Sequence, residues 1–250
     1  MNELRTRWEQ RAARAGDAPA GVLFQGLSEN ANAALHAWHA AVLEAHFLPR
    51  LRDGTRMLDL GCGYGRLGAI VRVRRPDIAV IGQDFVLTYC RAFARNVGPV
   101  VQADLEAPPF ATDAFDGIVA VTSLMYAAAP RRAAVFARLA RLLRPGGVML
   151  LLDPGAEMLR LLGRLRPGTS PTGGEGFTRA DYVDLARGAG LRVEARGGNP
   201  NLTCVLLVPR LARAGGGIGA GLLRRAGRAD ARAGGYARFA LHRWLLVTRA

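Results

Sequence analysis

One stretch, MLDLGCGYGRLGAIV from Met57 to Val71, decides the fold. It begins with an apolar run typical of a buried strand, continues through a loop rich in glycine and ends in a helical pattern. Glycine adopts positive φ angles and lets backbone amides approach a ligand more closely than larger residues would. Parallel α/β folds bind small ligands at such a loop between a strand and a helix, so the stretch predicts a binding loop.

Short apolar runs and helical patterns alternate beyond this stretch, which predicts an α/β fold with a doubly wound, mostly parallel sheet. The expected strands are 56–60, 79–83, 99–103, 116–122, 148–153 and 191–196. The expected helices are 66–74, 86–96, 131–143 and 178–189, with a turn at Pro145-Gly146-Gly147.

Two further regions complete the predicted organisation. Residues 1–50 are expected to form an N-terminal helical cap with a helix near 30–47, which packs on the sheet or covers the mouth of the site. Residues 51–250 are expected to form the main domain, interrupted by an insertion at 197–242 that is rich in glycine and arginine.

The composition is that of a globular protein, because half of the 250 residues are hydrophobic and 22% are charged. The net charge of +14 comes from arginine alone, since the chain has no lysine, and we interpret most of it as surface charge. Residues 209–243 form a local concentration of arginines. This segment is hypothesised to be a basic lid for an acidic or carrier-bound substrate, or a contact with a membrane surface; the alternative is a solvated crossover.

The three cysteines, Cys62, Cys90 and Cys204, have neither disulfide nor zinc-site spacing, so a reducing cytoplasm is expected and no metal is. No apolar run is long enough for a membrane span.

A dinucleotide is the competing ligand for the glycine-rich loop. The run from Gly63 to Gly68 satisfies the GxGxxG pattern, and Asp84 lies close to the distance at which a dinucleotide fold holds its ribose. The register argues against this interpretation, because Gly63 stands two residues further from the strand than Gly61. Asp59 at the strand end would repel a pyrophosphate but suits a ligand with an ammonium group.

The run DLGCGYG, residues 59–65, resembles the first motif of the class I S-adenosylmethionine-dependent methyltransferases, and the resemblance continues in order across residues 56–196. It implies a Rossmann-like sheet of seven strands with helices on both faces and S-adenosylmethionine as the cofactor. In this family an antiparallel last strand lies between the fifth and the sixth, a place that suits HRWLLVTRA at the C-terminal end. The long insertion is similar to those of small-molecule enzymes of the quinone-biosynthesis type.

The resemblance also assigns residues to the cofactor. Asp84 matches the acidic residue that accepts hydrogen bonds from the ribose hydroxyls, and Asp104 matches the one near the adenine amino group, followed by apolar Leu105. The expected cofactor-binding residues are Asp59, Gly61, Cys62, Gly63, Gly65, Asp84, Phe85, Asp104, Leu105 and Thr122.

Catalytic candidates are fewer, because an in-line displacement on an activated methyl donor depends mainly on placing the acceptor. His36, His39 and His46 share one helical face, and a general base among them is one interpretation. Tyr126 and Asp153 follow the fourth and fifth strands, where either could orient an acceptor. We therefore take His36, His39 and Tyr126 as the catalytic candidates.

The sequence thus predicts a methyltransferase that acts on a small molecule, with an oxygen acceptor ahead of nitrogen or carbon. An RNA methyltransferase is one alternative, favoured by the charge. A nucleic-acid partner is unlikely, because the fourth strand ends in Thr122-Ser123-Leu124 and lacks the Asn/Asp-Pro-Pro-aromatic signature of enzymes that methylate base amines. The other alternative is a cofactor-binding protein of the same fold without turnover.

Overall fold

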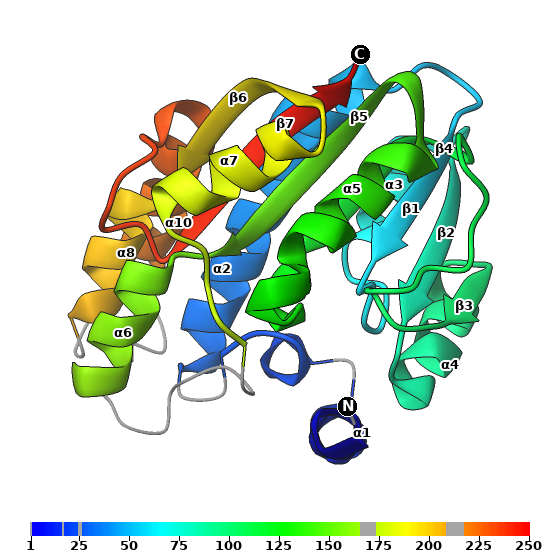
Figure 1. Cartoon of the computed structure of the whole chain (residues 1–250). Coiled ribbons are helices and arrows are strands. Elements are labelled where there is room, and N and C mark those ends of the chain that lie inside the picture. The colour runs from blue at the N-terminus through cyan, green and yellow to red at the C-terminus, as the bar shows by residue number, and fades with distance from the viewer. Residues whose placement is uncertain (1, 17, 25–26, 166–173, 209–217) are drawn as a thin grey trace.

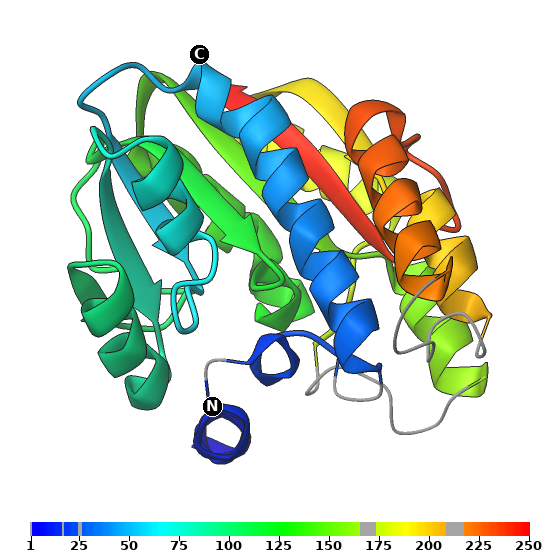
Figure 2. The same cartoon turned by 180° about the vertical axis from the view of Figure 1, so that it is seen from behind.

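The computed structural model describes residues 2–16, 18–24, 27–165, 174–208 and 218–250. Its centre is a seven-stranded sheet in the order β3-β2-β1-β4-β5-β7-β6, with helices on both faces (Figures 1 and 2). The strands are β1 (Arg56–Leu60), β2 (Ala79–Asp84), β3 (Val100–Gln102), β4 (Phe115–Val121), β5 (Leu143–Pro154), β6 (Leu191–Gly198) and β7 (His242–Arg249). The helices are α1 (Asn2–Ala15), α2 (Glu29–Val42), α3 (Gly68–Arg74), α4 (Leu87–Asn96), α5 (Arg132–Leu142), α6 (Ala156–Leu165), α7 (Arg179–Gly188), α8 (Pro200–Leu207) and α10 (Ile218–Ala233).

The strand pairing confirms the predicted fold class. Strands β1 to β5 pair in parallel, whereas β7 runs antiparallel to both of its neighbours, β5 and β6. The first residue of β7, His242, lies opposite Pro154 at the end of β5. The start of β7 is therefore brought to the edge at which the parallel strands end, where ligands bind in such sheets.

Side chains of successive strand residues point to opposite faces, so each buried strand supplies two hydrophobic layers. Met57 and Val119 belong to the layer under α2, α3, α4, α8 and α10, while Leu58 and Ile118 belong to the layer under α5 and α7. Burial on both faces explains why the strands are almost continuously apolar in sequence.

Helix α2 lies across the first of these layers, beside β7 and α10 (Figure 2). Ser28 caps it, because the Ser28 Oγ accepts a hydrogen bond from the Ala31 amide at 3.3 Å. A π-helical turn, Leu43–Phe47, continues the helix, so the predicted helical stretch of 30–47 is confirmed in substance. Its inward face carries Leu35, Trp38 and Val42.

Several predictions about elements need correction. Strand β5 begins at Leu143, before the predicted start at Val148, and residues 144–147 form a bulge in it, because β4 pairs with Leu143 and next with Val148. Helices α1 and α6 were not predicted. The insertion at 197–242 contains α8 and α10, which pack on each other and, through α10, on α2, while residues 209–217 lie outside the described part of the chain.

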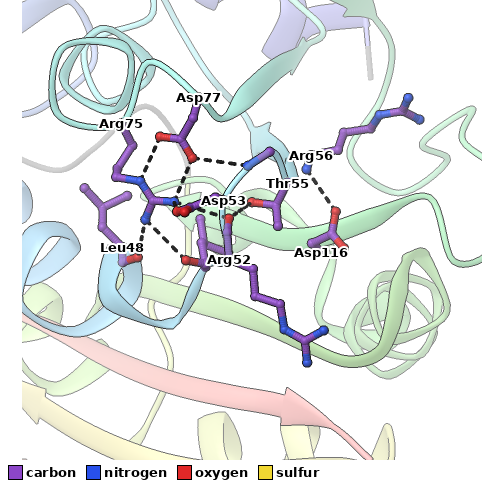
Figure 3. A network of polar contacts seen from close by, with 10 residues as sticks. Leu48, Arg52, Asp53, Thr55, Arg56, Arg75, Asp77 and Asp116 are labelled. Atoms are coloured by element: carbon purple, nitrogen blue, oxygen red, sulfur yellow. Dashed lines mark hydrogen bonds and ion pairs between the residues drawn. The ribbon is translucent and has the colours of Figure 1, made fainter.

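At the edge where the strands begin, Arg75 joins residues 48–53 to the turn that leads into β2 (Figure 3). Its guanidinium donates hydrogen bonds to both carboxylate oxygens of Asp77, at 2.9 and 2.8 Å, and to Asp53 at 3.0 Å. It also reaches the Leu48 and Leu51 carbonyls, at 3.4 and 3.2 Å. Arginine suits this position because its planar fork presents five donors. The network fixes the entry into β1 and β2 far from the opposite, ligand-binding edge.

The N-terminal helix α1 lies at the edge where the parallel strands end, as their arrowheads show in Figure 1. Within the part of the chain that the structure describes, no helix combines the length and apolarity needed to cross a membrane.

Candidate functional site

The glycine-rich loop connects the end of β1 to the start of α3. Gly61 and Gly63 have positive φ angles of +69° and +54°, a conformation that side chains other than glycine rarely adopt. The Gly61 and Cys62 amides both donate to the Gln83 carbonyl, at 2.7 and 3.0 Å, which holds the loop against β2. A Cβ atom on Gly61 would overlap the Cβ of Ser123 after β4. The loop is thus wedged between the ends of two neighbouring strands.

A cavity opens over this loop. It encloses about 500 Å³ of empty space, including its open mouth, and combines residues from the ends of β1, β2 and β4 with residues of the N-terminal segment. Its lining residues are Trp8, Val22, Gly61, Gly63, Gln83, Asp84, Phe85, Val86, Tyr89, Ala103, Leu105, Thr122, Ser123 and Tyr126. We call it the loop cavity.

Asp84 ends β2 at the centre of this cavity. Its Oδ2 accepts a hydrogen bond from the Gly63 amide and its Oδ1 accepts one from the Val86 amide, each at 2.9 Å. Burial raises the pKa of Asp84 to about 6, an effect that these amide donors partly oppose. Each oxygen keeps a second lone pair, so the carboxylate can also accept from a bound hydroxyl.

Three polar atoms in the lining have no hydrogen-bond partner among the described residues. They are the Trp8 Nε1, the Ser123 Oγ and the Gln83 Oε1, and all three residues are buried, at 6%, 5% and 1% exposure. Unpartnered buried polar atoms are costly and are normally satisfied by water or a ligand. Their presence here indicates that the loop cavity is built to receive a polar molecule.

Thr122 has a strained backbone at the end of β4. Its φ is +56°, an outlier for a β-branched residue, and its amide donates to the Leu152 carbonyl of β5 at 2.7 Å. Such strain persists only where surrounding structure enforces it, and it concentrates at ligand sites. Thr122 lines both the loop cavity and a second cavity beside it.

The second cavity, here the side cavity, encloses about 240 Å³ of empty space, including its mouth. It is lined by Val22, Leu23, Phe24, Thr122, Met125, Tyr126, Pro154 and His242. Val22, Thr122 and Tyr126 belong to both linings, so the two cavities adjoin. The arrangement offers two neighbouring subsites at one edge of the sheet.

The N-terminal segment closes the site from outside. Trp8 of α1 makes edge-on ring contacts with Tyr126 and Tyr89, with ring centroids 5.4 and 6.3 Å apart. Glu9 fastens α1 to α4, because its carboxylate accepts from the Leu87 amide at 2.7 Å and from the Thr88 hydroxyl at 2.8 Å. The part of the predicted N-terminal cap that covers the site is therefore α1 and the turn after it, while α2 packs on the sheet.

The predicted cofactor-binding residues fall into two groups. Gly61, Gly63, Asp84, Phe85, Leu105 and Thr122 line the loop cavity. Asp104 lines a groove that shares Phe85 and Leu105 with this cavity, as a residue near one end of a bound ligand would. The other three, Asp59, Cys62 and Gly65, do not line these spaces.

Packing accounts for two of these three residues. The Cys62 sulfur packs against Gly82 of β2, so closely that a Cβ added at Gly82 would lie 2.9 Å from it. Gly65 packs against Phe93 and Val97. Asp59 lies behind the loop, where burial raises its pKa to about 7 while Arg66 and the Gly68 amide favour its charged form. Asp59 lines neither cavity, so its contact with an ammonium group of the ligand stays a prediction.

The structure separates the three histidines of the predicted cluster. The His36 Nδ1 lies 3.2 Å from an Arg66 nitrogen, whereas the His46 Nε2 faces the Ala231 carbonyl at 3.0 Å. His39 is 1% exposed and its Nε2 lies 2.8 Å from the Nδ1 of His242. None of the three lines either cavity, whereas His242 lines the side cavity. A catalytic role for His36 or His39 stays a prediction that the cavity linings do not support.

Of the other candidates, Tyr126 lines both cavities and its catalytic role stays a prediction. Asp153 is turned into the sheet's other face, where it accepts from the Met125 amide at 3.1 Å and the Tyr182 hydroxyl at 2.9 Å. Burial raises its pKa to about 7. Asp153 therefore fixes the chain after β4 and lines neither cavity. Among the described residues, no cluster suited to a metal ion is present.

Comparisons with known proteins bear on this geometry. Residues 57–147 match the family model described as a methyltransferase domain. Residues 57–147 therefore carry a methyltransferase domain, in a fold of the class I type. The prediction of this fold, and of S-adenosylmethionine as the cofactor that belongs to it, is confirmed at the level of the family. The finer similarity to quinone-biosynthesis enzymes stays a prediction.

Two curated relatives and one solved structure illustrate the likeness of this methyltransferase domain. A malonyl-[acyl-carrier protein] O-methyltransferase of Legionella pneumophila is 28% identical, over 43% of this chain and 39% of that protein. A fatty-acid O-methyltransferase of Mycolicibacterium smegmatis is 29% identical, over 55% of this chain and 49% of that protein. The chain thus spans about half, or less, of the length of these relatives. A TehB-like S-adenosylmethionine-dependent methyltransferase of Corynebacterium glutamicum has a TM-score of 0.56 at 16% identity, covering 98% of this chain and 95% of that one.

The residues present fit this cofactor. The glycine backbone at Gly61 and Gly63 permits close approach, Asp84 can accept from ribose hydroxyls, and the unpartnered Ser123 and Gln83 oxygens provide further acceptor positions. Sequence reasoning did not identify Trp8, Gln83, Ser123 or His242. A signal existed for Trp8, because Leu4, Trp8 and Ala12 recur every four residues along α1. None existed for His242, whose partner His39 is 203 residues away in sequence.

Proposed function

We propose that this methyltransferase domain transfers the methyl group of S-adenosylmethionine to an oxygen of a small molecule. The observation that carries the proposal is the pair of adjoining cavities, one over the glycine-rich loop and one beside it, which meet at Thr122 and Tyr126. Two subsites that share a wall suit a donor and an acceptor whose reacting atoms must be held in line.

Different residues of the chain hold the donor and exclude water from the two subsites. The cofactor, when bound, supplies a methyl group on a positively charged sulfur. The backbone of Gly61 and Gly63 and the carboxylate of Asp84 would hold the donor, and Phe85 and Leu105 of the same lining would pack on its adenosine. The segment containing Trp8 and Val22 excludes water from both subsites. Placement and desolvation of this kind contribute much of the rate in a displacement reaction.

An oxygen acceptor is supported by two relatives, whose names are O-methyltransferases. An acidic or carrier-bound acceptor stays a prediction. The arginines of α10 that suggested it, Arg224, Arg225, Arg228 and Arg232, are exposed and line neither cavity. The hypothesis of a basic lid therefore loses its support in the described part of the insertion, although a carrier protein could still dock on this helix.

The first experiment is calorimetry of the whole chain with S-adenosylmethionine, with S-adenosylhomocysteine and with NAD. We expect the first two to bind and NAD not to bind. The Asp84→Ala variant should lose at least about tenfold in affinity for S-adenosylhomocysteine, because one charge-assisted hydrogen bond contributes about 1.5–3 kcal/mol. Asp153→Asn, a buried carboxylate outside both cavities, is the matched control and should bind normally.

Binding of NAD alone, or equal affinity of the Asp84→Ala variant and the wild type, would contradict the assigned site. A methyl-transfer assay with radiolabelled donor then separates the alternatives. Transfer to small hydroxyl compounds supports the proposal. Transfer to RNA, with affinity falling steeply as salt rises, would establish the RNA methyltransferase instead. Tight cofactor binding without transfer to any class would leave a non-catalytic binding protein.

A further inference from the structure

His242 is the one titratable side chain that lines the side cavity without belonging to the loop cavity, among the residues described. It opens β7, opposite Pro154, and its side chain has no exposed surface. Its Nε2 has no hydrogen-bond partner among the described residues. A fully buried ring nitrogen left unpartnered beside a cavity is costly unless a ligand completes it.

The other ring nitrogen of His242 is held by His39 of α2, the helix that lies beside β7 in Figure 2. The His242 Nδ1 and the His39 Nε2 are 2.8 Å apart, and the two rings are stacked with centroids 4.9 Å apart. One proton lies between them, so the pair has two tautomeric arrangements. In one, His242 donates from Nδ1 and presents a bare lone pair at Nε2, and a ligand that donates a hydrogen bond selects this arrangement.

Both rings are neutral. Burial, together with a smaller effect of the nearby Arg66 guanidinium, lowers the pKa of His242 to about 3. Burial and Arg66 also hold the pKa of His39 well below its usual value. A neutral imidazole accepts a proton, so His242 is ready to act as an acceptor at physiological pH.

The insertion fixes the position of His242. The Asn199 Oδ1 accepts a hydrogen bond from the His242 amide at 2.9 Å. The Thr203 Oγ1 accepts one from the Leu241 amide at 2.8 Å. Asn199 and Thr203 lie at the start of α8 and are buried, at 0% and 2% exposure. Rigid support of this kind is what a residue needs in order to meet a reacting atom.

The remaining lining of the side cavity limits the acceptor. Val22, Leu23, Phe24 and Met125 are apolar, and no charged side chain is among the described lining residues. An ionised carboxylate placed there would lose its hydration without gaining a countercharge, which is strongly unfavourable. A neutral O–H group keeps its hydrogen bond by donating to the imidazole.

We propose that His242 takes the proton from the acceptor, and that the acceptor is a neutral hydroxyl on an apolar body, of the phenol class. The inference rests on the proposed function. As the acceptor oxygen forms its bond to the donor methyl carbon, the electron pair of the broken carbon–sulfur bond stays on sulfur, and the acceptor proton moves to the Nε2 of His242. The oxygen becomes positively charged as its new bond forms, so its proton becomes strongly acidic and a weak base suffices. His39 is a positioning residue, because it acts only through His242.

The test uses the whole chain saturated with S-adenosylhomocysteine and labelled with ¹⁵N-histidine. The probes are 2-naphthol and, as a matched carboxylate, 2-naphthoic acid. We expect 2-naphthol to shift the ¹⁵N resonance of the His242 Nε2, and 2-naphthoic acid to leave it in place. The His242→Asn variant assigns the signal. The His39→Gln variant should change the tautomer signature of His242, which a purely structural role for His39 would not do.

Methyl transfer to 2-naphthol gives the second readout. His242→Asn should lower the rate by at least about 100-fold, the usual contribution of a general base, with S-adenosylhomocysteine affinity within about twofold of wild type. His46→Asn is the matched control, because His46 stacks on Trp244 away from both cavities. The inference is overturned if 2-naphthol does not bind or leaves His242 unshifted, if naphthoic acid is the better acceptor, or if His242→Asn keeps wild-type transfer. If the wild-type protein does not bind S-adenosylhomocysteine at all, the proposed function itself is contradicted.

Discussion

Gly61 and Gly54 have nearly the same backbone conformation, with φ angles of +69° and +68°, but different surroundings. A Cβ added at Gly54 meets no atom within 4 Å, whereas one at Gly61 would overlap Ser123. Gly54 is glycine because of its φ angle alone. Gly61 combines the same φ angle with contact between the loop and the end of β4, which is what places its backbone in the cavity.

Substitution of Gly54 and of Gly61 by alanine should therefore have different effects on stability and on cofactor binding. Gly54→Ala should reduce the free energy of unfolding by about 1–3 kcal/mol, the usual cost of a strained backbone conformation. Gly61→Ala should cost about 1–3 kcal/mol more, because Ser123 must move, and it should also abolish S-adenosylhomocysteine binding. Urea unfolding and calorimetry measure the two effects. Equal stability losses, or unchanged cofactor affinity in Gly61→Ala, would contradict the wedged position of the loop.

At this scale, sequence reasoning succeeds where function depends on local backbone. Gly61, Gly63 and Asp84 lie where the motif predicts, because strand, loop and following helix are adjacent in sequence. The predicted role of Asp59 stays a prediction, because Asp59 sits behind the loop near the Gly68 amide and Arg66 and does not line the loop cavity. Sequence reasoning misses His242, because no local pattern reveals a contact between distant segments.

Among the elements, α8 depends on one acid of the arginine-rich insertion. Asp230 of α10 accepts hydrogen bonds from the Asn201 amide at 3.2 Å and the Leu202 amide at 2.7 Å, the free donors of the first turn of α8. Asp230 is 1% exposed, and burial raises its pKa. The acid that interrupts the arginines in sequence is thus the residue that joins the two helices of the insertion.

Replacing this cap should loosen the insertion. Asp230→Ala should reduce the free energy of unfolding by about 2 kcal/mol, at the upper end for a helix cap, because the buried Leu202 amide and the part-buried Asn201 amide lose their acceptor. Thr178 caps α7, because its Oγ1 accepts a hydrogen bond from the exposed Asp181 amide. Thr178→Ala removes this cap and should reduce the free energy of unfolding by about half as much as Asp230→Ala. Chemical denaturation of both variants checks the order. A larger loss in Thr178→Ala would show that α8 does not depend on Asp230.

The elements themselves were largely predictable, since each buried strand is a short apolar run between turn residues. The strand order, including the antiparallel β7, followed from the family resemblance. The sequence does not predict helix α6. The run Pro145-Gly146-Gly147 is typical of a turn, and Gly146 does have a positive φ of +75°. In the structure this run bulges within β5, because β4 pairs with Leu143 and next with Val148, and β7 pairs only from Val148 on.

For the whole molecule, buried titratable groups act in opposite directions. His39 and His242 are neutral when folded, and the Arg66 and His36 side chains near them disfavour a further positive charge. Unfolded histidines bind protons below about pH 6.5, so these two groups reduce stability as the pH falls below that value. Asp59 and Asp153, with pKa values raised to about 7, take up protons in the folded state and increase stability over the same fall.

Substitution of one histidine separates these contributions. Between pH 7 and pH 5 the wild type should lose up to about 2 kcal/mol relative to His242→Asn, because the variant lacks one group that protonates only on unfolding. Urea unfolding of both proteins at the two pH values gives the difference. A constant difference would mean that His242 takes up its proton over the same pH range in the folded and the unfolded protein.

The position of β7 has a further consequence during synthesis. Residues 148–152 of β5 are all apolar and buried, and among the described residues the edge of this run away from β4 pairs with β7 alone. A ribosome adding about 5–20 residues per second needs several seconds to make residues 155–241, and throughout that interval the nascent chain exposes an unpaired apolar edge. Such edges template aggregation, so the cell must shield this strand, by a chaperone or by the ribosome surface, until its antiparallel neighbour emerges.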